Sequence, residues 1–88
     1  MNLDFKVNKL YRFNGDGAIK AICDVAISGE FLVKGFRVIK GKNGLFVGGP
    51  REQGKDGKWY SNAFPLTASS KEALNEVVLL AYERSSNQ

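Results

Sequence analysis

The pair Asn43-Gly44 constrains this chain more than any other local feature, because it separates two runs of β-forming residues. A type I′ turn needs positive φ at both central residues, and asparagine and glycine adopt positive φ at low cost. Residues 31–39 precede the pair and residues 45–47 follow it, which predicts two antiparallel strands joined by a tight turn. Gly48-Gly49-Pro50 then ends the second strand, since proline cannot donate to a strand ladder.

Two further strands are expected before this hairpin. Leu3, Phe5 and Val7 alternate with polar residues, which is typical of a half-buried strand, and the alternation slips near Tyr11, where a bulge is expected. A second strand is expected over residues 18–27. It places five residues on one face: Ile19, Ala21, Cys23, Val25 and Ile27. The strand over residues 31–40 is expected to be central, because it is almost continuously β-branched and aromatic.

Residues 51–58 are polar and charged, and they are expected to form a loop. Within it, Asp56-Gly57 predicts a hairpin that leads into a fifth strand over residues 59–64, which Pro65 ends. A helix is then expected from Ser69 to about Arg84, because Ser69 and Glu72 have the spacing of a capping box.

An apolar stripe with helical spacing predicts the face of this helix that packs on the sheet. Its members are Leu74, Val77, Val78, Ala81 and Tyr82. Leu79 falls outside the stripe. It is interpreted either as a single exposed leucine, which is common, or as part of a contact with another protein.

Strands followed by one helix predict an α+β fold, with an antiparallel sheet of about five strands and one C-terminal helix packed on it. Residues 1–84 are expected to form a single domain, and residues 85–88 a short flexible tail. An open sheet has edge strands with unpaired backbone groups, which can accept a strand of a second copy. A homodimer through the sheet edge, the helix or both is therefore expected.

The absence of histidine and the presence of one cysteine among 88 residues restrict the chemistry. An internal disulfide, the usual Cys/His metal sites and histidine-dependent catalysis are excluded. Cys23 is interpreted as a small core residue. The acidic residues are scattered, so neither an enzyme nor a cofactor is expected. The first residues lack the pattern of a secretory signal and no stretch is apolar enough to cross a membrane, so a cytoplasmic protein without membrane contact is expected.

Positive charge is concentrated in the first 60 residues, which carry eleven Lys and Arg against six Asp and Glu, within a net charge of +4. The candidate nucleic-acid-binding residues are Lys40, Lys42, Arg51, Lys55 and Lys58. Such residues can follow a phosphate backbone, and neutralised phosphates gain affinity through counterion release. Trp59 and Tyr60 are candidates for stacking on unpaired bases. The alternatives are that the charges are merely solvated and that Trp59 belongs to the core.

Several motifs of the chain occur in the order and with the spacing of one known family. They are residues 37–41 (Arg-Val-Ile-Lys-Gly), residues 43–47 (Asn-Gly-Leu-Phe-Val), Pro50, Asp56-Gly57, Lys20-Ala21, Val25, Ile27, residues 63–66 (Ala-Phe-Pro-Leu) and Tyr82-Glu83. Together they resemble the SpoVG family (stage V sporulation protein G, or septation protein) over roughly residues 3–83.

The resemblance implies a homodimeric regulator of gene expression that binds DNA and in some members RNA, through a basic stretch just after the proline. In this chain that stretch is residues 51–55, where Glu52 and Gln53 stand at positions that are basic in many relatives. Gly48-Gly49 likewise replaces a bulkier pair. The alternative is a protein-interaction module in septation or sporulation-type regulation that makes no direct contact with nucleic acid.

Overall fold

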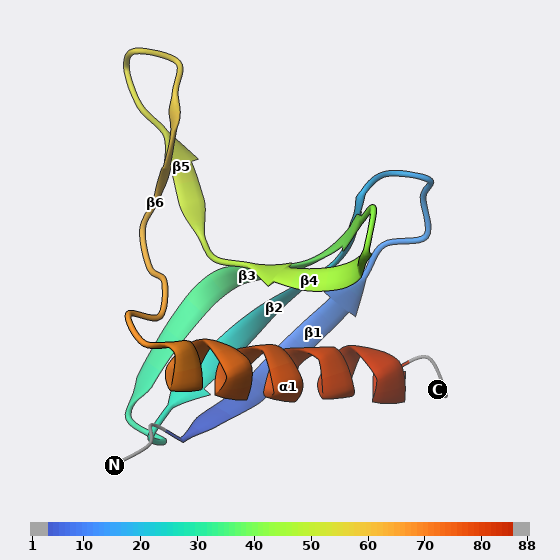
Figure 1. The fold of residues 1–88 in the computed structure, drawn as a ribbon, viewed down its shortest axis with the longest axis vertical. Coiled ribbons are helices and arrows are strands. Elements are labelled where there is room, and N and C mark those ends of the chain that lie inside the picture. Colours follow the sequence, from blue (N-terminus) through green and yellow to red (C-terminus); the bar gives the residue numbers. More distant parts are fainter. Residues whose placement is uncertain (1–3, 86–88) are drawn as a thin grey trace.

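The computed structural model describes residues 4–85, in which strands precede a single long helix (Figure 1). Four strands form an antiparallel sheet in sequential order: β1 (Phe5–Arg12), β2 (Ile19–Ile27), β3 (Phe31–Gly41) and β4 (Gly44–Gly48). A separate two-stranded ribbon follows, made of β5 (Arg51–Gln53) and β6 (Trp59–Ser61). The helix α1 (Ala68–Ser85) closes the described chain. The α+β prediction is confirmed, with the strands divided between a sheet of four and a ribbon of two.

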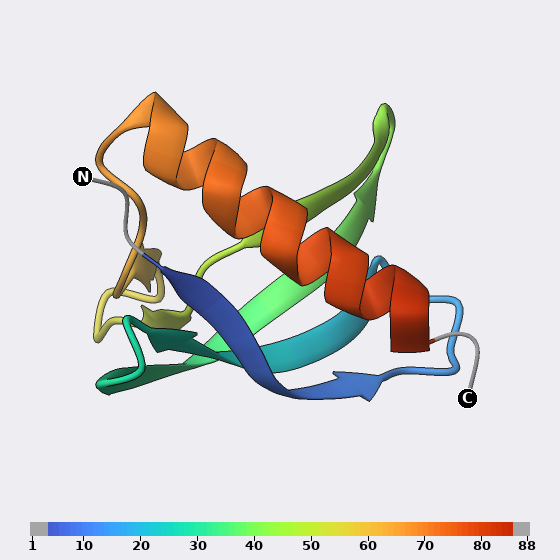
Figure 2. The same cartoon turned by 90° about the horizontal axis from the view of Figure 1, so that it is seen from below.

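Helix α1 lies across one face of the four-stranded sheet and leaves the other face without a helix (Figure 2). The buried side chains between them come from β2, β3 and α1: Ala21, Cys23, Val25, Phe36, Val38, Leu74 and Val78. Burial, and next the Asp24 carboxylate, raises the pKa of the Cys23 thiol to about 11. The core interpretation of Cys23 is confirmed. Leu79 is partly buried against this core, so its interpretation as an exposed leucine is wrong.

The bulges in the strand pairing do not lie where the sequence pattern predicts a bulge. The β1–β2 register shifts between Val7 and Lys9, and not near Tyr11. A second shift, between Ile19 and Ala21, pairs Ile19 with Ile39. Ile19 therefore lies away from the buried face that Ala21 shares with Cys23, contrary to prediction, because one extra residue in a strand reverses the direction of the side chains beyond it.

The β3–β4 hairpin forms as predicted, but its turn is of another type. Gly41 pairs with Gly44, so Lys42 and Asn43 form the turn. Gly44 has a φ of 116°, whereas Asn43 has no positive φ. The type I′ prediction is therefore wrong. Two residues therefore connect the strands, and Gly44, the first residue of β4, takes the positive φ that glycine adopts at low cost.

Side chains at both ends of α1 satisfy its backbone groups. The Ser70 amide donates to Thr67 Oγ1 at 3.1 Å, so the N-cap is Thr67, and the prediction of Ser69 as the N-cap is wrong. At the other end, Arg12 Nη1 donates to the Tyr82 carbonyl oxygen at 2.6 Å, and the guanidinium lies 3.9 Å from the centre of the Tyr82 ring. Arg12 thus joins β1 to the last turn of the helix. Ser85 belongs to that turn, and the rest of the expected tail, residues 86–88, lies outside the described residues.

Helix α1, the one helix within residues 4–85, is not long and apolar enough to cross a membrane. In the same part of the chain, no three His, Cys, Asp or Glu side chains are placed to hold a metal ion.

Candidate nucleic-acid interface

Residues 51–61 form an arm that projects from the sheet (Figure 1). Its two strands pair through Arg51 with Ser61 and Gln53 with Trp59, and the predicted hairpin at Asp56-Gly57 is confirmed. At the tip, the Gly54 amide donates to the Lys58 carbonyl oxygen at 2.8 Å. The expected loop is therefore shorter than predicted, because Arg51–Gln53 is a strand.

Asp56 and Tyr60 hold the tip of the arm in shape. The Tyr60 hydroxyl donates to Asp56 Oδ2 at 2.5 Å, and the Lys58 amide donates to Asp56 Oδ1 at 3.0 Å. The Tyr60 bond, more than the Lys58 bond, lowers the pKa of the Asp56 carboxyl, and the same contact raises the pKa of the Tyr60 hydroxyl. The Tyr60 ring also lies over Gly54, where an added Cβ would be 2.8 Å from Tyr60 Cε2. Tyr60 therefore has a structural role within the arm.

Arg51 and Trp59 lie together at the root of the arm. The Arg51 guanidinium carbon is 4.8 Å from the centre of the Trp59 ring, within the range of a cation–π contact. Trp59 is 56% exposed, so it does not belong to the core. Its indole is thus available to a ligand beside a fixed positive charge.

The predicted basic residues fall into two separate groups. Arg51, Lys55 and Lys58 belong to the arm, whereas Lys40 is the next-to-last residue of β3 and Lys42 is in the β3–β4 turn. The arm and this turn lie at opposite ends of β4 (Figure 1), and a strand of that length separates them by roughly 15–20 Å. One protomer therefore presents two basic regions and not one continuous patch.

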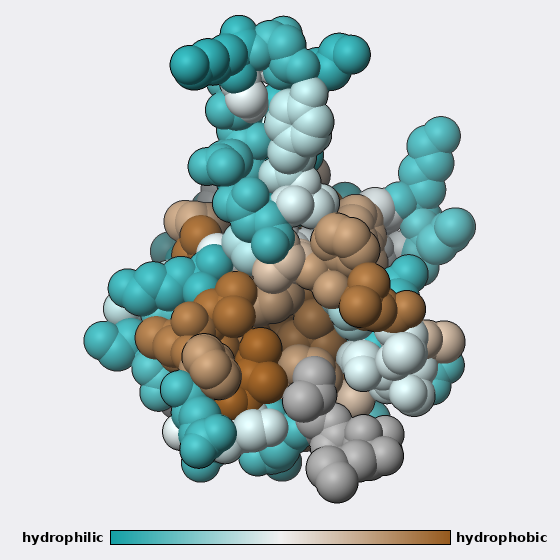
Figure 3. All heavy atoms as spheres, turned by 90° about the vertical axis from the view of Figure 1, so that its left-hand side faces the viewer, coloured by the Kyte–Doolittle hydropathy of each residue, from teal (hydrophilic) through white to brown (hydrophobic). Residues whose placement is uncertain are grey.

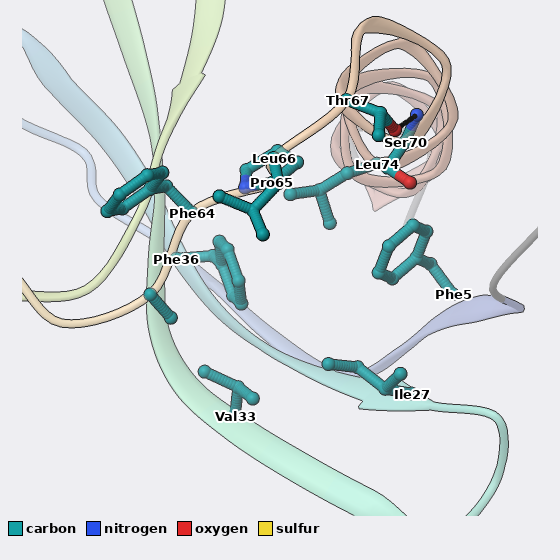
Figure 4. A pocket seen from close by; sticks show the side chains of 11 residues that line it. Phe5, Ile27, Val33, Phe36, Phe64, Pro65, Leu66, Thr67, Ser70 and Leu74 are labelled. Carbon is teal, nitrogen blue, oxygen red and sulfur yellow. Dashed lines mark hydrogen bonds between the residues drawn. The ribbon is translucent and has the colours of Figure 1, made fainter.

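An apolar groove lies below the arm, between the start of α1, the end of β2 and the first half of β3 (Figures 3 and 4). Its volume is about 280 Å³, and it is lined by Phe5, Phe36, Leu74 and the connection between β6 and α1. In that connection Phe64 is 65% and Leu66 is 91% exposed. Sequence reasoning missed this groove. Phe64 was expected to end a fifth strand, whereas β6 ends at Ser61.

The match to a family model settles which family this architecture belongs to. The SpoVG model matches residues 3–84, which include the sheet, the arm and almost all of α1. The chain belongs to the SpoVG family. The resemblance inferred from the sequence motifs is confirmed.

Individual members of the SpoVG family are similar over most of the chain. A protein of Listeria monocytogenes (serotype 4b) named "Putative septation protein SpoVG 2" is 41% identical over 76 residues, which are 86% of this chain and 74% of the relative. "Putative septation protein SpoVG" of Brevibacillus brevis is 40% identical over 86% of this chain and 80% of its own length. The protein with the same name from Geobacillus thermodenitrificans is 37% identical, with coverage of 86% and 79%.

Proposed function

We propose that this chain is a non-enzymatic regulator of gene expression of SpoVG type that binds DNA or RNA through basic residues of the arm. The supporting observation is the arm itself. It stands away from the four-stranded sheet, and all six residues of its two strands are exposed (Figure 1). Arg51, Lys55 and Lys58 are spaced along it, next to the exposed indole of Trp59.

A two-stranded ribbon has dimensions that suit a polyanion. The major groove of DNA admits such a ribbon, and lysine and arginine on it can neutralise phosphates on both sides. Glu52 and Asp56 reduce the net charge of the arm. Binding is therefore expected to be of moderate affinity from one protomer alone.

A homodimer would compensate for this low charge, because two arms on one polymer act at a high effective concentration. The apolar groove supports such an association, since exposed apolar surface often marks an interaction site. We propose that a second copy covers this groove, in addition to or in place of pairing at a sheet edge. Leu66→Asp is expected to convert the dimer into a monomer in sedimentation analysis. An unchanged mass would remove the groove from the interface.

Fluorescence polarisation of labelled double-stranded DNA, single-stranded DNA and RNA, measured over a salt series, tests the binding proposal. The double substitution Arg51→Glu and Lys55→Glu is expected to lower affinity at least tenfold and to flatten the salt dependence. Lys71→Glu, on the exposed side of α1, reverses one charge away from the arm and is expected to change affinity less than threefold. Equal affinities of the double variant and the wild type would reject the arm as the site.

The alternative function is a protein-interaction module, and the same groove favours it. In that case the groove would accept an apolar segment of another protein, and the arm charges would be incidental. Salt separates the two functions: phosphate contacts weaken steeply as salt rises, whereas an apolar contact does not.

A further inference from the structure

A second cationic site lies at the root of the arm, on the sheet face that α1 does not cover. It is a hollow of about 340 Å³. Ile19 and Ile22 contribute apolar surface to it, and its other lining residues are Lys34, Gly35, Arg37, Pro50, Arg51 and Trp59. None of the residues that line it is acidic, although Asp24 pairs with Lys34 in the ladder and Glu52 follows Arg51. The site thus combines three cations, an aromatic ring and an apolar wall.

Arg37 is the residue that the sheet itself builds into this hollow. It pairs with Gly48 on β4, where an added Cβ would be only 2.7 Å from Arg37 Nη2. The missing side chain at Gly48 therefore gives the guanidinium room to lie across β4. There Nη2 donates to the Gly49 carbonyl oxygen at 2.9 Å, which holds the side chain beside the arm.

The charge of Arg37 lacks a compensating anion in the described part of the chain. Its buried Nε has no hydrogen-bond partner there. Burial, and next the charge of Arg51, lowers the pKa of the Arg37 guanidinium, although arginine stays protonated in proteins. A bound anion would offset both the burial of the guanidinium and its repulsion by Arg51, because it places an opposite charge at short range.

The remaining features of the hollow point to more than a phosphate. The Trp59 ring is 56% exposed and borders the hollow, and Ile19 and Ile22 offer apolar contact to a flat, weakly polar group. A nucleobase has these properties, but in a duplex its faces are covered by stacking. A single strand presents both the phosphate and the free face of the base.

We propose that this hollow binds one unpaired nucleotide of a single-stranded nucleic acid, with the phosphate at Arg37 and Arg51 and the base against Trp59. The inference rests on the proposed function and deepens it by naming the form of the polymer. It adds Arg37 and Lys34, which the sequence analysis did not select, to the binding residues.

Trp59 is the single tryptophan of the chain, so its fluorescence reports on this hollow directly. An octathymidylate and a 12-base-pair duplex are titrated into the full chain, and binding of each is followed in parallel by the anisotropy of a labelled oligonucleotide. The octathymidylate is expected to quench Trp59 at saturation, and the duplex is not. Arg37→Met is expected to weaken octathymidylate binding at least tenfold and duplex binding less than threefold. Lys71→Met serves as the control for loss of one charge.

A second pair of variants avoids dependence on the half-buried Arg37. Trp59 is exposed, so Trp59→Ala is expected to fold and to weaken octathymidylate binding about tenfold, as the loss of one stacked base does. Trp59→Phe keeps an aromatic face and is expected to restore most of the affinity. Circular dichroism confirms that each variant is folded.

Three results would overturn the inference. Binding of both polymers without quenching, and with Arg37→Met equal to wild type, would reject the hollow but leave the proposed function in place. Absence of binding to either polymer at 50 mM salt would reject both. Quenching by thymidine monophosphate without binding of the octathymidylate would make the hollow a site for a free nucleotide.

Discussion

The sheet under α1 and the arm are both antiparallel β-structure, but different forces hold them. The sheet buries apolar side chains from β2 and β3 against the helix, so a slip of one residue would turn those side chains to the solvent. The arm has two strands of three residues, all exposed, and relies on hydrogen bonds at its tip. Isolated two-stranded ribbons are marginally stable in water. We therefore expect substitutions in the sheet to change stability, and substitutions in the arm to change binding.

The largest expected effect is that of Phe36→Ala in the sheet. Phe36 is 3% exposed, and its loss leaves a cavity between β3 and α1, which costs about 3–5 kcal/mol. For a domain of this size, such a loss lowers Tm by roughly 12 °C or more. Thermal unfolding followed by circular dichroism measures it. A Tm within 5 °C of the wild type would show that the core does not carry the stability of the sheet.

A smaller effect is expected at the junction of the two regions, where Gly48 and Gly49 form a matched pair. A Cβ at Gly49 would lie close to the backbone carbonyl oxygen of Ala63, so the arm root must move, at a cost of about 1–3 kcal/mol. A Cβ at Gly48 meets only the ends of the Arg37 and Ile39 side chains, which can rotate away. Gly49→Ala is thus expected to lower Tm more than Gly48→Ala. The reverse order would contradict this assignment.

The smallest effect is expected at the tip of the arm, and it depends on pH. The pKa of Asp56 is lowered in the folded arm, so its contribution is present above its ordinary pKa near 4 and is lost as pH falls through the lowered value. The pKa of Tyr60 is raised, so its contribution is present below its ordinary pKa near 10 and is lost as pH rises through the raised value. The protection of the Gly54 amide from exchange, taken relative to its intrinsic exchange rate at each pH, should therefore fall towards both extremes of pH, while protection in the sheet changes less. Tyr60→Phe removes the shared hydrogen bond, and a pH response equal to that of the wild type would disprove its role.

Local patterns predicted the elements of both regions well. Alternation identified the buried face of β2 through Ala21, Cys23 and Val25, and Asp56-Gly57 located the hairpin of the arm. Predictions that depended on register or on a single turn were less successful. Ile19 lies on the opposite face from the one predicted, because a bulge separates it from Ala21. The turn after β3 consists of Lys42 and Asn43 and not of the predicted pair Asn43-Gly44. A bulge inserts one residue without any composition signal, so alternation alone does not locate it.

The candidate site divides in the same way. Arg51, Lys55 and Lys58 were selected because they are near one another in sequence, and the hairpin keeps them on one arm. Lys40 and Lys42 were selected by the same criterion, but β4 places them at the other end of the sheet. Arg37 was not selected, since it lies within a strand rich in apolar residues and carries no signal of exposure.

The sequence by itself determined the four strands of the sheet, the helix and the family, because hydrophobic period, turn residues and motif order are written within short stretches of chain. Only the tertiary structure decided that Arg37 and Trp59 line one hollow and that Phe64 and Leu66 border an open groove. These neighbours are far apart in sequence and meet through sheet pairing, through the room left at Gly48 and through the path of the chain between β6 and α1. Such proximity depends on the packing of whole elements, which no short stretch of sequence specifies.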